Sequence, residues 1–68
     1  MVNSELLSEK LEKSGYKTSY VVEKLGISRN AFYRKRDNKI PFRAAEIYVL
    51  CDLLRIQESE KDSVFFAE

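Results

Sequence analysis

The sequence contains no histidine, a single cysteine and no long apolar run, and each absence excludes a class of function. Without histidine, the chain lacks the commonest general base and a common metal ligand. Cys51 alone cannot form an intramolecular disulfide or build a zinc site, so neither a metal centre nor another cofactor is expected. No apolar run reaches the roughly 18 residues needed to span a bilayer, so no membrane association is expected. A reducing cytoplasm is the expected location.

Glycine and proline are also scarce, with Gly15, Gly26 and Pro41 the sole representatives in 68 residues. A chain of this length is expected to form one domain over residues 1–68, with a small core. It offers no glycine-rich loop to hold a phosphate and little room for a substrate cavity. We therefore expect neither enzymatic activity nor a small-molecule ligand.

The net charge of +1 conceals an uneven distribution of charge along the chain. Residues 29–43 carry six lysines and arginines against one acid, a local charge of +5, whereas residues 44–68 sum to −4. A concentrated basic block is typical of a surface that binds a polyanion. On charge alone, a solvated helix face explains the block equally well.

Apolar residues recur at helical spacing between the glycines and the proline, which predicts an all-α fold of five short helices. The expected ranges are 4–14, 18–26, 29–37 and 43–54, followed by a short helix opened by a capping box at residues 59–62. The fourth helix is the most apolar and should form the central core element, with Ala44 and Cys51 on its inward stripe. Tyr16 is expected in the core, and Tyr20 and Tyr48 are expected to be half-buried.

Residues 18–36 have the pattern of two short helices packed across a tight turn. Gly26 supplies the turn, and Ser28 offers its hydroxyl to the free N–H groups that open the second helix. Apolar side chains before and after the turn fill the crossing, namely Val21, Leu25, Ile27 and Phe32.

This segment resembles the helix-turn-helix of the phage repressor and Cro family. Residues 25–35 are especially similar to the small Cro-like regulators of phages and prophages of Gram-positive bacteria. The resemblance extends over nearly the whole chain and implies a compact five-helix, lambda repressor-like domain with its helix-turn-helix at about residues 18–37. The chain departs from the family at Val22, where alanine is favoured, at Lys35 and Arg36, where an apolar residue is usual, and at Arg55, where glycine is typical.

The third helix supplies the residues expected to read the DNA sequence. On a helical wheel, Phe32 points inward, with Ala31 and Lys35 on the same side. The resemblance places the opposite face in the major groove, where arginine pairs with guanine and asparagine with adenine. Base contacts are therefore expected from Arg29, Asn30, Tyr33 and Arg34.

Contacts to phosphate are expected on either side of this face. They come from the start of the preceding helix, the cap and last turn of the third helix, and the segment beyond it, namely Thr18, Ser19, Ser28, Lys35, Arg36, Lys39 and Arg43. A second role is open for Lys35 and Arg36, whose aliphatic stems can cover the core. Asp37 lies on the same arc and repels phosphate unless it pairs with a cation.

The predicted function is sequence-specific binding of double-stranded operator DNA by a transcriptional repressor in a bacterial or phage-infected cell. Whether it acts as a homodimer, and whether Val64, Phe65 and Phe66 serve the core or a dimer interface, stays open. One alternative is an excisionase-like architectural factor, which needs a β-hairpin after the third helix. Another is an antitoxin-like or anti-repressor module that binds protein through its C-terminal third.

Overall fold

The computed structural model describes residues 1–67, in which the chain forms five helices and no strand. The helices are α1 (Ser4–Ser14), α2 (Thr18–Leu25), α3 (Arg29–Arg36), α4 (Ala44–Leu53) and α5 (Glu58–Phe65). The predicted all-α, lambda repressor-like fold is confirmed. The described residues provide no β-hairpin after α3, so the excisionase-like alternative loses the element that it requires.

Most helix boundaries fall within a residue of those predicted, because side chains or left-handed residues fix the ends. The Asn3 side chain accepts a hydrogen bond from Leu6 N and opens α1, and Gly15 closes it with a φ of 76°. The start of α5 was predicted wrongly. Gln57 rather than Ser59 precedes the helix, and the Gln57 N–H donates to Glu60 Oε1 at 3.4 Å.

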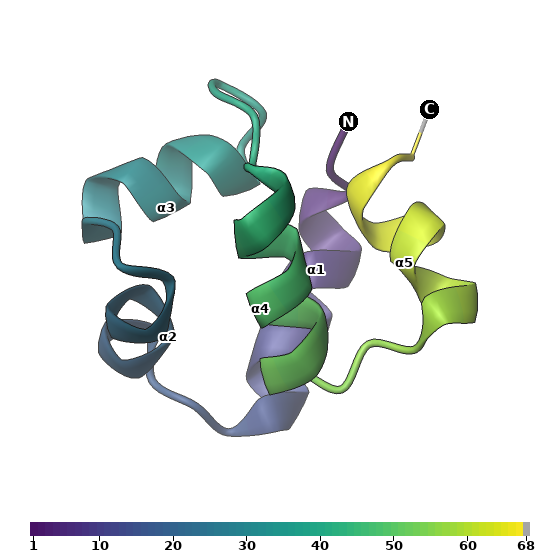
Figure 1. Ribbon diagram of the computed structural model, residues 1–68, viewed down its shortest axis with the longest axis horizontal. Helices are drawn as coiled ribbons and strands as arrows, with labels where there is room; N and C mark the ends of the chain where they lie inside the picture. Colours follow the sequence, from purple (N-terminus) through teal and green to yellow (C-terminus); the bar gives the residue numbers. More distant parts are fainter. Residues whose placement is uncertain (68) are drawn as a thin grey trace.

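The core is built around α4, which lies at the centre of Figure 1 with α2 and α3 on one side and α5 on the other. Every helix contributes at least one fully or almost fully buried apolar side chain: Leu7, Val21, Phe32, Leu50, Val64 and Phe65. The Phe42 ring contacts both Phe32 and Phe65, with centroids 6.2 and 5.8 Å away, and so links α3 to α5. Val64 and Phe65 thus serve the core.

Four residues expected in the core or at its boundary are exposed to solvent instead, and Tyr20 is one of them, at 39% exposed. Ala44 is exposed and Tyr48 is 78% exposed, because both lie on the face of α4 that turns away from Leu50. Tyr16 is 44% exposed and stacks on Tyr20, with ring centroids 4.9 Å apart. The apolar stripe of α4 is therefore narrower than its sequence indicates.

Helices α2, α3 and α4 end in the same way, with a residue in the left-handed conformation. These residues are Gly26, Asn38 and Arg55, with φ values of 71°, 64° and 56°. In each case the next N–H bonds back to the helix: Ile27 N to Val22 O, Lys39 N to Arg34 O and Ile56 N to Cys51 O. This is the Schellman arrangement, in which glycine is the usual left-handed residue.

The Asn38 side chain, besides ending α3, forms hydrogen bonds to the N-terminal segment. Its side-chain Oδ1 accepts from Val2 N at 2.8 Å, and its Nδ2 donates to Val2 O at 3.0 Å. Ser4 Oγ donates to Arg36 O, and Asn3 N donates to Val64 O at 2.8 Å. The N-terminal segment is thereby fastened both to the end of α3 and to α5.

Asn38 and Arg55 are the two left-handed residues that are not glycine. We expect substitution by glycine to change the free energy of unfolding in opposite directions at these two positions. Arg55→Gly should raise the free energy of unfolding by about 0.5–1 kcal/mol, since left-handed backbone strain outweighs the entropy cost of glycine. Asn38→Gly should lower it by about 1–2 kcal/mol, since two hydrogen bonds to Val2 are lost. Urea unfolding followed by circular dichroism measures both. Shifts of the same sign would contradict the role assigned to the Asn38 amide.

None of the helices within residues 1–67 combines the length and apolar character that a bilayer crossing demands.

Candidate nucleic-acid interface

The turn between α2 and α3 brings the two helices together across buried apolar side chains. Val21 is fully buried and Phe32 is 1% exposed, so both helices are anchored to the core close to their crossing. Gly26 adopts the left-handed conformation, and the Ser28 hydroxyl accepts from Ala31 N at 3.1 Å, opening α3. The predicted helix-turn-helix and the inward orientation of Phe32 are confirmed.

The outward face of α3 presents the side chains predicted to read bases. Arg29, Asn30 and Arg34 are exposed, whereas Tyr33 is half-buried. Residues four apart on a helix lie on the same face, so Arg29 neighbours Tyr33, and Asn30 neighbours Arg34. The structure brings all four to one surface of an eight-residue helix.

Arg36 and Asp37 form a local pair at the end of α3. The Arg36 guanidinium lies 4.9 Å from the centroid of the Tyr33 ring, and its Nε donates to Asp37 Oδ1 at 3.0 Å. The acid on the DNA-facing arc therefore has a cationic partner. Arg36 also orients Tyr33 through the contact with its ring.

The start of α2 lacks a side-chain cap. Lys17 occupies the capping position, and its side chain accepts no hydrogen bond from the helix. Thr18 is half-buried and Ser19 is exposed, and the first N–H groups of an α-helix have no partner within the helix. The N–H groups at this end of α2 can donate hydrogen bonds to a phosphate oxygen.

Lys35 does not belong to the surface. It is 8% exposed, and its Nζ donates to Oε1 of the equally buried Glu46 at 2.5 Å. The same carboxylate oxygen accepts from Arg43 N at 2.8 Å, at the start of α4. The prediction of a phosphate contact from Lys35 is therefore wrong, because its ammonium is directed into the protein and its stem covers the core.

The Glu46 carboxylate is held in its charged form despite its burial. Burial alone raises the pKa of Glu46, but two hydrogen bonds, from the Lys35 ammonium and the Arg43 N–H, and the positive charges of the Lys35 and Arg43 side chains together lower it by more. The net pKa lies below the ordinary value for glutamate. Glu46 thus joins α3 to α4 through a charge-assisted hydrogen bond to Lys35.

Sequence reasoning missed Glu46 and Asn38 as residues that position α3. Glu46 lies four residues before Leu50 and therefore on the apolar stripe of α4, and Lys35 lies on the inward side of α3. An acid and a lysine that both point inward indicate a buried ion pair, and this was the signal that was missed. The signal for Asn38 was weaker. An asparagine after a helix indicates a left-handed turn, but nothing local indicates that its amide binds Val2.

The other four basic side chains of residues 29–43 make up what we call the positive surface. Arg29, Arg34, Lys39 and Arg43 are exposed, and within residues 1–67 none of them forms an ion pair. They extend from the start of α3 through the following loop to the start of α4. The positive surface therefore includes the outward face of α3.

An exposed, cationic helix anchored behind a glycine turn in a five-helix domain defines a helix-turn-helix DNA-binding domain. Residues 6–60 match the family model of the Cro/C1-type HTH DNA-binding domain, and the chain belongs to this family. No curated protein and no solved structure gives a significant match. The chain is thus a transcription-regulator domain that binds double-stranded DNA. Its family is not generally enzymatic.

Proposed function

We propose that the chain is a sequence-specific, Cro- or repressor-like regulator that places α3 in the major groove of an operator. The observation that carries this proposal is the exposure of Arg29, Asn30 and Arg34 on the side of α3 opposite the buried Phe32. Because the core fixes Phe32, these three side chains are presented on a rigid helix rather than on a loop. Rigid presentation favours direct reading of base edges.

Each side chain has a proposed partner on the duplex. Arg29 and Arg34 pair with guanine, Asn30 pairs with adenine, and Tyr33 contacts a thymine methyl group or a phosphate. Phosphates on either side are held by the start of α2, the α3 cap and the loop beyond α3, namely Thr18, Ser19, Ser28, Arg36, Lys39 and Arg43. The absence of a side-chain cap on α2 and the exposure of Lys39 and Arg43 support this assignment.

The biological setting is part of the proposal. The regulator represses by occupying its operator in the cytoplasm of a bacterial cell, in a phage or prophage circuit, without a cofactor or small-molecule ligand. It binds as a homodimer on a pseudo-palindrome whose half-sites lie about 34 Å apart on one face of the duplex. Support comes from the family match and from the small size of α3, since eight residues read only a few base pairs.

Selection from a pool of random duplex DNA tests this function. We expect enrichment of a short motif, repeated with inverted symmetry at a spacing of about one helical turn. Titration with generic duplex at low ionic strength accompanies the selection. If the chain binds neither the random pool nor the generic duplex, the alternative of a protein-interaction module is favoured. The exposed Phe66 is then the expected contact with the protein partner.

Substitution of the base-reading residues should cost affinity in a sequence-dependent way. Arg29→Ala, Asn30→Ala and Arg34→Ala should each weaken binding to the selected motif by about 1–3 kcal/mol and relax the preference at one base position. Lys39→Ala should weaken binding to selected and random duplexes equally, which makes it the matched control. Fluorescence anisotropy on both duplexes measures the difference. Losses of equal size on both duplexes for all four variants would contradict the proposed roles.

A further inference from the structure

Asp37 is the one acid among residues 29–43, and it lies on the arc of α3 that the proposed function turns towards DNA. Its N–H donates to Tyr33 O at 2.9 Å, so Asp37 continues the hydrogen-bond pattern of the helix. Residues four apart on a helix share a face, which places Asp37 beside Tyr33. The Asp37 side chain is 48% exposed. Its negative charge repels the phosphates of any duplex, and base reading and phosphate contacts do not explain its presence.

The backbone is held on both sides of Asp37. Ser4 Oγ donates to the carbonyl oxygen of Arg36, the residue before it. The side chain of Asn38, the residue after it, forms two hydrogen bonds with Val2. The fold therefore sets the position of the Asp37 side chain on the DNA-facing surface.

The Asp37 carboxylate determines where the Arg36 guanidinium lies. Arg36 Nε donates to Asp37 Oδ1 at 3.0 Å, and Nη2 donates to Oδ2 at 3.4 Å. Contact at two points fixes the plane of the guanidinium. In this orientation its central carbon lies over the Tyr33 ring, 4.9 Å from the centroid. Two of the five N–H donors of Arg36 are used, so Arg36 can still donate to a phosphate, but its charge is cancelled.

These contacts have different consequences for generic and operator DNA. Generic binding depends almost entirely on charge, and Asp37 removes one positive charge from the surface that provides it. Operator binding depends in addition on base contacts, to which an oriented Tyr33 ring contributes. Specificity is a difference of affinities, and it increases when a group weakens binding to competitors more than binding to the target.

We propose that Asp37 is a specificity-determining residue, which cancels the charge of Arg36 towards generic DNA and, through Arg36, positions Tyr33 against a base. The inference rests on the proposed function, and it assigns Tyr33 to a thymine methyl group and not to a phosphate. Asp37 is a positioning residue, since it acts through its neighbours and does not touch DNA. Exposed ion pairs contribute little to stability, so the effect of the pair is expected in DNA binding and not in folding.

Asp37→Asn tests the proposal, because it removes the charge and keeps the size of the side chain. Affinity for generic duplex should rise about fivefold at low salt, since one like charge near a phosphate is lost. Its salt slope should grow in magnitude by about 0.9 for each bound chain. The ratio of affinities for the selected motif and the generic duplex should fall about two- to fivefold, the value of an exposed cation–π contact. Fluorescence anisotropy on both duplexes measures slope and ratio.

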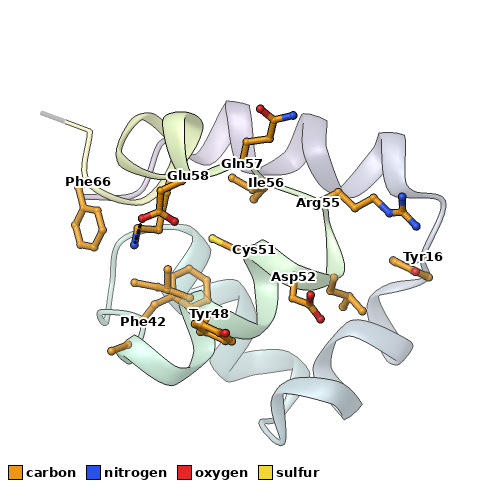
Figure 2. Close-up of a pocket in the computed structure, with 14 residues that line it drawn as sticks. Tyr16, Phe42, Tyr48, Cys51, Asp52, Arg55, Ile56, Gln57, Glu58 and Phe66 are labelled. Atoms are coloured by element: carbon orange, nitrogen blue, oxygen red, sulfur yellow. Dashed lines mark ion pairs between the residues drawn. The ribbon is translucent and has the colours of Figure 1, made fainter.

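Asp62→Asn is the matched control, because it makes the same change of charge at an exposed acid of α5. In Figure 1, α3 and α5 lie on opposite sides of α4. Figure 2 shows Glu58 of α5 at the open groove between α4 and α5, and none of the residues proposed to contact DNA lines this groove. Asp62→Asn should therefore leave the slope and the ratio unchanged.

A double variant separates the orientation of Tyr33 from the gain of charge. Arg36→Gln combined with Asp37→Asn removes both members of the pair and keeps the net charge of the parent chain. Its ratio of affinities should fall as far as that of Asp37→Asn, because Tyr33 has lost its cation in both variants.

A readout without DNA follows the contact itself. The Arg36 guanidinium lies over the Tyr33 ring, whose ring current shifts the NMR resonances of the Arg36 side-chain protons. In Asp37→Asn, these resonances should move towards the positions of an unstructured arginine. In Asp62→Asn, they should keep the positions of the parent chain. Circular dichroism verifies that every variant folds.

Three results would overturn the inference. They are an Asp37→Asn variant that binds both duplexes as Asp62→Asn does, a double variant that keeps the ratio of the parent chain, and Arg36 resonances that Asp37→Asn leaves unchanged. Failure of the proposed function looks different. A parent chain that binds both duplexes equally would reject sequence-specific recognition. A parent chain that discriminates, with an Asp37→Asn variant that discriminates equally well, would reject the role of Asp37 alone.

Discussion

Glu46→Gln should lower the free energy of unfolding by about 3–5 kcal/mol, one of the largest effects expected of any single substitution in this chain. The substitution keeps the size of the side chain but leaves the Lys35 ammonium buried without a countercharge. At roughly 0.05–0.15 kcal/mol per residue, the total stability of a 68-residue domain is about 3–10 kcal/mol. A large fraction of the variant should therefore be unfolded, which urea titration followed by circular dichroism measures.

Two further variants separate the ion pair from general damage to the core. The double variant Lys35→Met with Glu46→Leu should recover most of the loss, because neither buried charge remains. Glu9→Gln removes an acid from an ion pair of similar length, Lys13 Nζ to Glu9 Oε1 at 2.8 Å, but that pair is exposed. It should leave stability unchanged. If the double variant is no more stable than Glu46→Gln, the packing of α3 against α4 requires the ion pair, and apolar side chains cannot replace it.

The same pair gives the stability of the domain a defined dependence on acid. The folded pKa of Glu46 lies below its unfolded value of about 4.3, so the folded state favours the ionised carboxylate. Its contribution is complete above the unfolded pKa and is lost as the pH falls through the folded pKa. The double variant lacks this carboxylate, so its stability should fall less steeply than that of the parent chain in this acid range.

The helices could be predicted from sequence because their signals are local. The recurrence of apolar residues, the cap at Ser28 and the turn at Gly26 each act over five residues or fewer. The same local signals placed Phe32 inward and left Arg29, Asn30 and Arg34 outward. The exposed face of α3 therefore follows from the sequence, whereas its contacts with DNA stay a proposal.

The errors arise where distant segments decide the outcome. The helical wheel placed Lys35 on the inward side, but a phosphate role was kept because its long stem could carry the ammonium outward. Glu46, 11 residues away, holds the ammonium inside the protein. Tyr48 was expected at the boundary, but no element covers its face of α4. The Asn38 amide binds Val2 across 36 residues, and no local pattern could indicate that contact.

These contacts also change how the basic block is interpreted. The sequence gives residues 29–43 a charge of +5, but Lys35 is neutralised by Glu46 and Arg36 by Asp37. The net charge available to a polyanion comes from the other four basic side chains, namely Arg29, Arg34, Lys39 and Arg43. The phosphate contact proposed for Arg36 adds a hydrogen bond but no net charge, because Asp37 lies beside it. The strength of DNA binding and its dependence on salt should follow this smaller number.

Affinity for generic duplex DNA should therefore fall steeply with salt, by an amount that reports how many chains are bound. If each chain places its four free cations on phosphates, the slope of log affinity against log salt is about −4 for one chain and about −7 for two. Between 50 and 200 mM salt, affinity then falls about 150-fold for a monomer and about 20,000-fold for a dimer. Fluorescence anisotropy at several salt concentrations gives the slope.

Single-charge variants connect this slope to individual side chains. Lys39→Gln should reduce its magnitude by about 0.9 for each bound chain, since one phosphate contact is lost. Lys13→Gln is the matched control, because it removes an exposed lysine from α1, outside the positive surface. If both variants reduced the slope equally, binding would depend on net charge and not on the surface around α3. A selective effect of Lys39 would assign the salt dependence to the positive surface, and a parent slope near −7 would indicate two bound chains.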